Sequence, residues 1–577
     1  MNVTYHGGSA GSKVTLTEEK TGSITLIHLT VELPRPVSPE KLTLKWKYPS
    51  IGICSVWHPN ALFRRHLPPN WSRQICNSRL ASGAPVLSAI SKNGNNVITV
   101  ALSDADTATS IYCGVDEDDS TVDFAVELFC QPISPIERYD AVIRIDTGAI
   151  PFYEALQNVE KWWSDVCGYK EATVPDAARL PMDSLWYSFH RDLDTEAVLR
   201  ECREAKALGM DTVIIDDGWQ TDTHHGGYAY CGDWEVSKAK IPDMAAWVEA
   251  IHKIGMKVML WFSVPYVGAY AKSLERFKGM YLGAVRQNTT YCLDPRYPEV
   301  RKYLIETYRN SVINYGLDGL KLDFIDSFTL TPEAMKEDER RDYSSLEDAI
   351  DRLLSDVTET LKAIRPDILI EFRQSYIGPR IRKYGNMLRV ADCPNDLIRN
   401  RVSSIDLRLI SGGSAVHSDM IMWHPEESLE YASHQLLGIA FAVPQISLRL
   451  ENYPEEHKKL LKYYLSFWRE HRATLLDGKL TAMNPEDNYS LVSAQLDGEQ
   501  IAVRYAAVPF RLKGNTEKAF FFNASADTLT VITSETELCG REYIIRDNLG
   551  RTVSADRFGT GTNAMISVPV TGSIEIR

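Results

Sequence analysis

Acidic side chains follow several short apolar runs of this sequence, at the point where each run ends. Asp216 and Asp217 close "TVIIDDGW", Asp323 closes "GLKLDF", Glu371 lies near the end of "ILIEFR", and Asp392 closes "MLRVAD". A carboxylate after a strand is often the N-cap of the next helix, so each one alone is ambiguous. Gathered in one place, they would suit glycoside cleavage, in which one carboxylate attacks the anomeric carbon and another protonates the leaving oxygen.

The stretch "GLDGLKLDFID", residues 316–326, reads as a buried strand that nevertheless carries a cation and a carboxylate. Lys321 and Asp323 are two residues apart, so in a strand their side chains point to the same face. A nearby cation favours the ionised form that a carboxylate nucleophile needs. The alternative is a structural ion pair in the core. Asp326 is expected to be a loop or cap residue.

Strand-like and helix-like runs alternate over residues 181–476. "DSLWYSF", "DTVIIDDGW", "KVMLWFSVP", "DGLKLDF", "DILIEFRQ", "NMLRVADCP", "SAVHSDMIMW" and "PQISLRL" are the eight β candidates. Alternation of this length predicts a (β/α)₈ barrel, in which active sites form at the carboxyl ends of the strands. The carboxylates named above would therefore meet at one mouth.

The segments on either side of the predicted barrel have a different residue pattern, which consists of short strand-like runs separated by turns. Residues 1–174 contain β-branched alternation between Gly, Asn and Asp turns, such as "VTLTEEKTGSITLIHLTVEL", which predicts an all-β antiparallel sandwich. Short strands return in the tail, for example "QIAVRYAAV" and "KAFFFNAS". We therefore expect an N-terminal β-sandwich (1–174), a catalytic barrel (175–478) and a C-terminal β-sheet domain (479–577).

Composition narrows the possible partners. The 577 residues carry a net charge of −14, and the acidic residues are dispersed, which argues against nucleic acid and anionic membranes. The N-terminal residues lack the basic and apolar regions of a signal peptide, and no window resembles a membrane span, so we expect a cytoplasmic protein. The ten cysteines are scattered without metal-like spacing and are expected to be reduced core thiols.

Four blocks resemble the signature of glycoside hydrolase family 36, whose α-galactosidases share a clan with family 27. They are "DDGWQ", "GDW", "LDPRYPEVRKYL" and "DGLKLDF", and they keep the family's order over residues 186–392. The order of β-sandwich, catalytic barrel and C-terminal β domain is similar too. The resemblance implies a retaining exo-α-galactosidase that acts on a galactoside or oligosaccharide without a cofactor.

The resemblance also implies roles for individual residues. Asp323 matches the nucleophile that forms the glycosyl-enzyme, and Lys321 matches a donor to the ring hydroxyls of the sugar. Asp216 and Asp217 match the pair that grips the 4- and 6-hydroxyls, and both can face a ligand only if Gly218 allows the strand to end there. "RVADCPND" resembles the acid/base block, which points to Asp392.

Other positions are expected to contact the sugar or to shape the site. Asp396 would be a helix-start or sugar-contact residue. Since apolar and uncharged residues flank Asp392 in the chain, we expect a raised pKa for its carboxyl, as a proton donor requires. Four tryptophans could stack on a galactose ring, with Trp186 the first choice. The others, each as easily a core residue, are Trp219, Trp234 and Trp261.

Two departures from the family pattern leave the sugar open. Glu371 and Arg373 lie in "EFRQSYIGP", where family members commonly carry a Cys and a Gly-rich run, in the region that faces the 2-hydroxyl. Asn288, with Arg286 nearby, replaces an arginine that family members often hold before the "LD" block. An α-N-acetylgalactosaminide or a β-L-arabinopyranoside would present a similar axial 4-hydroxyl.

Three further alternatives remain. A transglycosylase of the raffinose-synthase type would keep every catalytic residue, and a non-catalytic carbohydrate-binding protein would keep the tryptophans with Asp216 and Asp217. A metal site is disfavoured, because no His joins the carboxylates at ligand spacing. Whether the chain forms homo-oligomers stays open.

Overall fold

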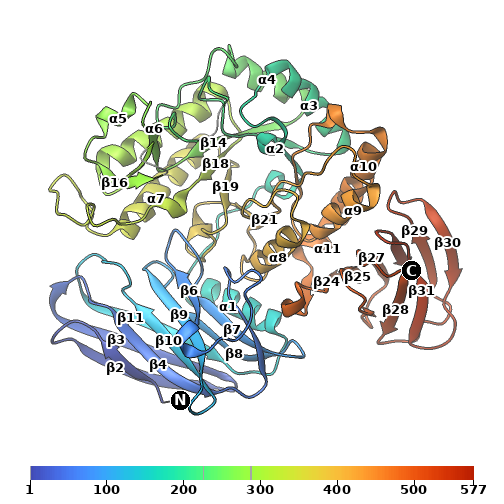
Figure 1. Cartoon of the computed structure of the whole chain (residues 1–577), viewed down its shortest axis with the longest axis horizontal. Helices are drawn as coiled ribbons and strands as arrows, with labels where there is room; N and C mark the ends of the chain where they lie inside the picture. Colours follow the sequence, from blue (N-terminus) through green and yellow to red (C-terminus); the bar gives the residue numbers. More distant parts are fainter. Residues whose placement is uncertain (1, 225–226, 286–288) are drawn as a thin grey trace.

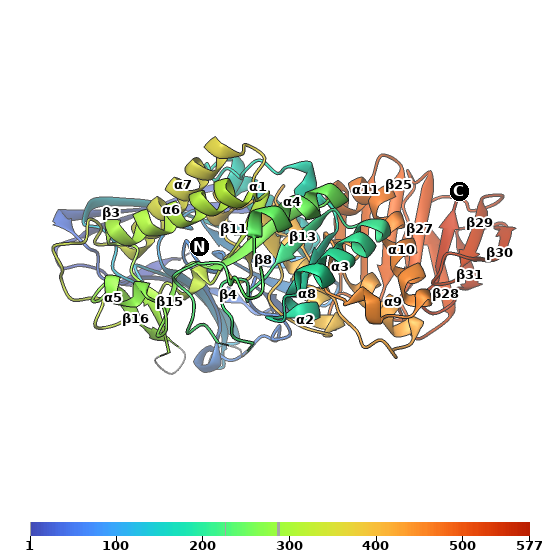
Figure 2. The same cartoon turned by 90° about the horizontal axis from the view of Figure 1, so that it is seen from above.

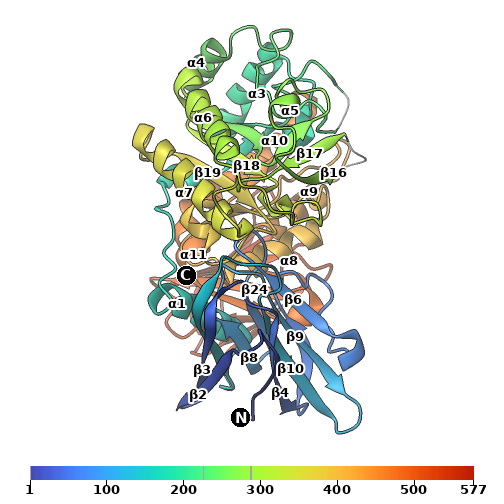
Figure 3. The ribbon, with the colours of Figure 1, turned by 90° about the vertical axis from the view of Figure 1, so that its left-hand side faces the viewer.

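The chain folds into three blocks: a β-sandwich, a barrel and a smaller β domain, drawn in blue, green to orange, and red (Figure 1). This computed structural model describes residues 2–224, 227–285 and 289–577. The barrel lies on the β-sandwich, and the C-terminal block lies at one end of the molecule (Figures 2 and 3). The predicted fold class is confirmed.

The N-terminal block consists of two antiparallel sheets, with strand orders β1-β4-β10-β9-β6 and β2-β3-β11-β8-β7-β5. Alternating apolar residues of the two sheets, such as Leu44, Phe124 and Ile143, share one buried core. The strands are β1 (Thr4–Gly7), β2 (Lys13–Thr21), β3 (Ile24–Val37), β4 (Leu42–Pro49), β5 (Ile53–Trp57), β6 (Gln74–Ser78), β7 (Val86–Ser91), β8 (Asn96–Leu102), β9 (Thr109–Asp116), β10 (Thr121–Leu128) and β11 (Ile136–Asp146).

The prediction that residues 1–174 are all-β is wrong, because the helix α1 (Phe152–Asp165) follows the last strand. Its buried residues Phe152, Leu156, Val159 and Trp163 recur at helical spacing, a signal that the sequence contains. The indole of Trp163 donates to the carbonyl of Leu102 at the end of β8 (2.8 Å), which fixes the helix to the sandwich.

The central block is an eight-stranded parallel sheet in the order β21-β20-β19-β18-β14-β13-β12-β22. A parallel bridge between His417 and Val443 links its two ends, which closes the barrel. The strands are β12 (Met182–Ser184), β13 (Thr212–Ile215), β14 (Lys257–Ser263), β18 (Gly319–Asp323), β19 (Leu369–Arg373), β20 (Met387–Arg389), β21 (Ala415–His417) and β22 (Gln445–Ile446).

Apolar side chains fill the barrel where its strands begin. Met182, Leu369, Met387 and Ala415, each the first residue of its strand, form one buried layer with Ile214 and Met259. Polar side chains such as Lys321, Asp323 and Glu371 lie further along their strands. The barrel therefore has a closed apolar floor and a polar upper part.

Helices between the strands form the outer layer, as Figure 1 shows. The side chain of Asp194 caps α3 by accepting from the backbone of Ala197, and Gly209 (φ 110°) ends it. The main helices are α3 (Thr195–Leu208), α4 (Met244–Ile254), α6 (Pro298–Tyr315), α7 (Leu346–Ile364), α8 (Leu397–Arg408), α9 (Leu429–Gly438) and α10 (Glu455–Glu470).

The first barrel strand is shorter than predicted. β12 ends at Ser184, and "LWYSF" forms the short helix α2 (Leu185–Phe189), so Trp186 follows the strand instead of lying in it. Asp183 is buried with Glu201 of α3, which accepts from the backbone of Leu450 (3.0 and 3.2 Å). Burial raises the pKa of Asp183 to about 8, and burial with the neighbouring Asp183 charge raises that of Glu201 to about 9.

The C-terminal block contains a seven-stranded sheet, β23-β24-β25-β27-β32-β29-β30, and a three-stranded sheet, β26-β28-β31. Phe510, Phe521 and Ile574 lie in the core between them. The strands are β23 (Lys479–Met483), β24 (Leu491–Leu496), β25 (Glu499–Arg504), β26 (Phe510–Leu512), β27 (Lys518–Asn523), β28 (Leu529–Ser534), β29 (Glu542–Arg546), β30 (Thr552–Arg557), β31 (Asn563–Ser567) and β32 (Ser573–Ile576).

One buried carboxylate connects the three blocks. Asp406 of α8 is 1% exposed and accepts from the indole of Trp57 (2.8 Å) and from the guanidinium of Arg65 (2.8 Å), both in the N-terminal block. The hydroxyl of Tyr489, just before β24, donates to the same carboxylate. These side chains are all buried, so the three blocks share a polar network as well as apolar contacts.

Three general features concern the described residues as a whole. No helix among them has the length and apolar character needed to cross a membrane. In the same residues, no cluster of three His, Cys, Asp or Glu side chains is arranged to hold a metal ion. All ten cysteines are free thiols as predicted, although Cys54, Cys130 and Cys539 are exposed instead of buried in the core.

Candidate active site

Asp323, the last residue of β18, is fixed by donors from three directions. Its Oδ2 accepts from the indole of Trp261 on β14 (3.0 Å), and its Oδ1 accepts from Nε of Arg373 on β19 (2.5 Å) and from the backbone of Phe324 (2.9 Å). Burial opposes ionisation, but the charges of Arg373 and then Lys321 outweigh it, so the pKa of Asp323 lies below its ordinary value. The carboxylate is held ionised and oriented.

Lys321 lies on the same strand as Asp323 but pairs with a different carboxylate. Its Nζ is 2.5 Å from Oδ2 of Asp216, which follows β13, and both side chains are buried. Oδ1 of Asp216 accepts from the backbone of Asp217 (2.8 Å). The ammonium therefore holds Asp216 in place and also lowers the pKa of Asp323 through space.

Asp217 has partners of its own, which differ from those of Asp216. Its Oδ2 accepts from Nε of Arg191 (3.0 Å), and its Oδ1 accepts from the amide of Gln220 (2.6 Å). The turn behind it depends on Gly218, whose φ is 127° and where a Cβ would lie 2.8 Å from the Cα of Arg191. The strand ends here as expected, and glycine is needed both for the conformation and for the close approach.

Arg389, the last residue of β20, lies among three carboxylates. Its Nη1 is 2.5 Å from Asp419, its Nη2 is 2.9 Å from Asp392, and its Nε is 3.4 Å from Glu371. Glu371 is fully buried and also accepts from the amide of Gln445, so this residue lies beneath the mouth instead of lining it. Arg389 is the cation that links the interior of the barrel to the loop carrying Asp392.

The prediction of a raised pKa for Asp392 is wrong. Burial would raise the pKa, but Arg389 and then Lys321 and Arg373 lower it to about 2. The apolar residues beside Asp392 in the chain do not determine its environment, because the cations come from its own and neighbouring strands. The side chain is 53% exposed, so this carboxylate is open to a ligand.

Asp396 has a structural role in this arrangement. Its side chain accepts from the backbone of Arg399 (3.0 Å) and so caps α8, as a helix-start residue would. Trp219 and Trp234 are buried and stack on each other in the core (ring centroids 6.0 Å apart). Trp186 is half-buried and meets His190 edge to face (4.8 Å), which leaves part of its ring accessible.

The comparisons with known proteins agree with this geometry. The family model described as Melibiase matches residues 182–478, slightly more than half of the chain. The chain belongs to the melibiase family. The predicted resemblance to family 36 glycoside hydrolases is confirmed, and the match covers all eight barrel strands.

Two α-galactosidases are similar over part of their sequences. AgaA of Geobacillus stearothermophilus is 24% identical over 182 residues, covering 30% of this chain and 25% of AgaA. Mel36A of Lactobacillus acidophilus is 27% identical over 157 residues, covering 26% of this chain and 20% of Mel36A. The matched stretch thus spans a quarter or less of these relatives' length.

Two solved structures have the same fold. A variant of AgaA in complex with raffinose superposes with a TM-score of 0.67 at 14% identity, covering 98% of this chain and 82% of AgaA. The α-galactosidase TtGalA of Thermus thermophilus superposes with a TM-score of 0.56 at 15% identity, covering 85% of this chain and 99% of TtGalA. At these identities the likeness shows the fold of the melibiase-family chain.

Four residues that contact the candidate site of this melibiase-family chain were not predicted from its sequence. They are Arg191, Arg389, Asp419 and Tyr187. Asp419 follows β21, so it carries the same signal as the other carboxylates at strand ends. It accepts from Tyr187 (3.1 Å) and from the backbone of Cys393 (2.6 Å), which fixes the loop beside Asp392. The predictions about Arg286 and Asn288 lie outside the described residues.

Proposed function

We propose that this melibiase-family protein is a retaining exo-α-galactosidase that hydrolyses terminal α-galactosides of oligosaccharides. The observation that supports this most directly is the environment of Asp323: an ionised carboxylate at a barrel strand end, oriented by Trp261 and Arg373. The α-galactosidase activity named for the relatives, and the raffinose bound in one structural neighbour, support a galactoside as the substrate.

In this proposal Asp323 attacks the anomeric carbon and forms a covalent glycosyl-enzyme, and Asp392 protonates the departing oxygen. Since the pKa of Asp392 is about 2 in the free protein, its carboxylate must take up a proton once substrate is bound. Desolvation by the sugar and loosening of the Arg389 contact would both raise that pKa. Asp392 then removes a proton from the water that releases the product.

Asp216 and Asp217 would accept from the axial 4-hydroxyl and the 6-hydroxyl. Their existing partners, Lys321 for Asp216 and Arg191 with Gln220 for Asp217, hold the carboxylates in position before the sugar arrives. Charge-assisted hydrogen bonds of this kind are about twice as strong as neutral ones. Trp186 would offer its accessible ring face to the sugar.

Proton NMR of the first-formed sugar tests the proposal, with nitrophenyl α-galactoside as substrate and α-glycosides that differ at C2, C4 and C5 beside it. We expect α-galactose first, and loss of more than about a thousandfold in turnover for Asp323→Asn. Asp367→Asn, at the opposite end of β19 where the side chain is 60% exposed, is the matched control.

Each alternative has a distinct result in the same experiment. If β-galactose appeared first, Asp323 would not be the nucleophile. If only another α-glycoside were turned over, galactose would not be the sugar that the site recognises. A galactosylated acceptor formed in preference to free galactose would indicate a transglycosylase. Binding of galactose without turnover of any substrate would indicate a carbohydrate-binding protein.

A further inference from the structure

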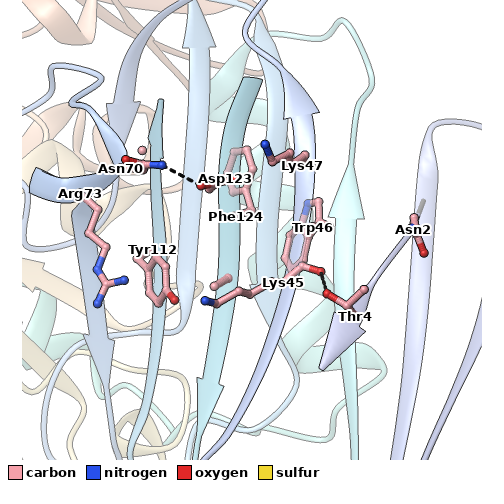
Figure 4. Close-up of a pocket in the computed structure, with 12 residues that line it drawn as sticks. Asn2, Thr4, Lys45, Trp46, Lys47, Asn70, Arg73, Tyr112, Asp123 and Phe124 are labelled. Atoms are coloured by element: carbon pink, nitrogen blue, oxygen red, sulfur yellow. Dashed lines mark hydrogen bonds between the residues drawn. The ribbon is translucent and has the colours of Figure 1, made fainter. Parts of the chain in front are cut away.

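The N-terminal sandwich has a cavity of about 480 Å³ on the outer face of its five-stranded sheet, which Figure 4 shows in close-up. We call it the sandwich trough, and the residues that matter below are Lys45, Lys47, Asn70, Arg73, Tyr112 and Asp123. Its volume falls in the range of small-molecule sites and is enough for one or two sugar rings. None of these residues belongs to the candidate active site in the barrel.

Strand register explains why the sheet is hollow here. Lys45, Ala125 and Tyr112 lie opposite one another on β4, β10 and β9, and Lys47, Asp123 and Gly114 form the next row. Ala125 therefore lies between the large side chains of Lys45 and Tyr112, and Gly114 adds no side chain beside Asp123. A Cβ on Gly114 would be 2.5 Å from the Cα of Asn70, so glycine also allows the adjoining loop to form a close wall.

One end of the sandwich trough carries positive charge. The guanidinium of Arg73 lies over the ring of Tyr112 (3.9 Å), and Figure 4 draws Tyr112 between Arg73 and Lys45. Among the described residues, neither cation forms an ion pair with a carboxylate. Lys47 differs, because Asp116 and Asp119 lie 2.7 and 2.6 Å from its ammonium. Two cations beside a hydroxyl are suited to a carboxylate.

The other end of the sandwich trough offers groups that bind hydroxyls. The amide of Asn70 donates to Oδ2 of Asp123 (3.0 Å), and each of these two cavity-lining side chains has a further oxygen that can accept a hydrogen bond. An inorganic anion would not use this end. Lys45 and Arg73 could donate to the hydroxyls of a neutral sugar, but their charge favours a carboxylate, to which hydrogen bonds are about twice as strong. A ligand that uses both ends carries a carboxylate and several hydroxyls.

We infer that the sandwich trough binds a saccharide that carries a carboxylate, such as a hexuronate unit. The carboxylate lies between Lys45 and Arg73, within reach of the Tyr112 hydroxyl, and the sugar hydroxyls meet Asn70 and Asp123. In a protein with a net charge of −14, two unpaired cations at one end of a cavity make a local attraction for an anion that the rest of the surface opposes.

Saturation-transfer NMR with digalacturonate as the probe tests this inference on the full chain. We expect digalacturonate to bind, and its uncharged methyl diester to bind at least about tenfold more weakly, because the charge-assisted hydrogen bonds are lost. Lys45→Gln and Arg73→Gln should each lower the affinity for digalacturonate by about tenfold, and the double variant should lower it further.

Two matched controls locate the site. Lys20→Gln removes a lysine of the other sheet, and Asp216→Ala disables the barrel mouth, so both should keep the affinity of the parent protein for digalacturonate. Equal affinity for the diester, or unchanged binding in the Lys45→Gln/Arg73→Gln double variant, would overturn the inference. Loss of binding in Asp216→Ala, or competition by acetate as strong as that by digalacturonate, would overturn it as well.

Discussion

Replacing Arg389 by methionine should destabilise the protein strongly, because this buried cation serves three carboxylates. Arg389 is 1% exposed, and its partners Glu371 and Asp419 are fully buried. Removing one member of a buried ion pair typically costs about 3–5 kcal/mol, since the remaining charge is left uncompensated. The unfolding entropy is about 2.1 cal/mol/K per residue, so 1 kcal/mol shifts the melting temperature of a 577-residue cooperative unit by about 0.8 °C, and the variant should melt about 2–4 °C lower than the parent.

The loss should also depend on pH. Burial already raises the pKa of Glu371 and of Asp419 above their ordinary values despite the neighbouring Arg389. Without that cation both pKa values rise further, so the folded variant holds protons that the unfolded chain releases above about pH 4. The stability of Arg389→Met should therefore fall as the pH rises, with a larger deficit at pH 8 than at pH 5.

Scanning calorimetry at the two pH values measures both effects, with Arg138→Met as the control. Arg138 also contacts two carboxylates, Asp140 (2.7 Å) and Glu32 (3.7 Å), but its side chain is 58% exposed. An exposed pair contributes about 0–1 kcal/mol, so this variant should melt within about 1 °C of the parent. Equal shifts for the two variants, or an Arg389→Met deficit that is the same at pH 5 and pH 8, would refute the reasoning.

The other predictions concern the proton donor, sugar recognition and a carboxyl pair outside the mouth. Asp392→Ala should keep the rate of glycosylation by dinitrophenyl galactoside, whose leaving group needs little protonation, and added azide should restore turnover of this variant with β-galactosyl azide as the product. Asp396→Ala, a helix-cap variant, should show neither effect. Asp217→Ala should lower the affinity for galactose, measured by calorimetric titration, by about tenfold or more. An unchanged affinity would mean that the sugar binds elsewhere. The raised pKa values of Asp183 (about 8) and Glu201 (about 9) mean that the folded protein loses stability as the pH rises from about 4 through 9. Asp183→Asn removes one of these carboxyls, so its melting temperature should fall less over the same pH range.

The sequence predicted the fold well where a pattern repeats. Eight alternating β and helical runs gave the barrel, and every predicted β run overlaps a barrel strand. Short-range details were less predictable: the apolar run "LWYSF" forms a helix after β12, although its composition favours a strand. α1 was missed because it lies within a β-rich segment, even though its apolar residues have helical spacing.

The candidate site was predictable at strand ends but not in its electrostatics. Asp216, Asp217 and Asp323 lie at the ends of β13 and β18, where the alternation placed them. The charge that governs Asp392 comes from Arg389, Lys321 and Arg373 on three different strands. Such contacts depend on strand order and register, which sequence neighbours do not reveal.

The network around Asp406 has a consequence for separating the barrel from its flanking blocks, or for exchanging one of them by recombination. Trp57 and Arg65 reach Asp406 from the N-terminal block, and Tyr489 reaches it from the C-terminal block. A barrel separated from both flanking blocks would keep a buried carboxylate whose partners are gone. A recombination event that exchanged either block would therefore have to bring a matching donor with it. Because side chains of both flanking blocks also pack into the largest hydrophobic core, the barrel depends on these blocks for part of its own interior.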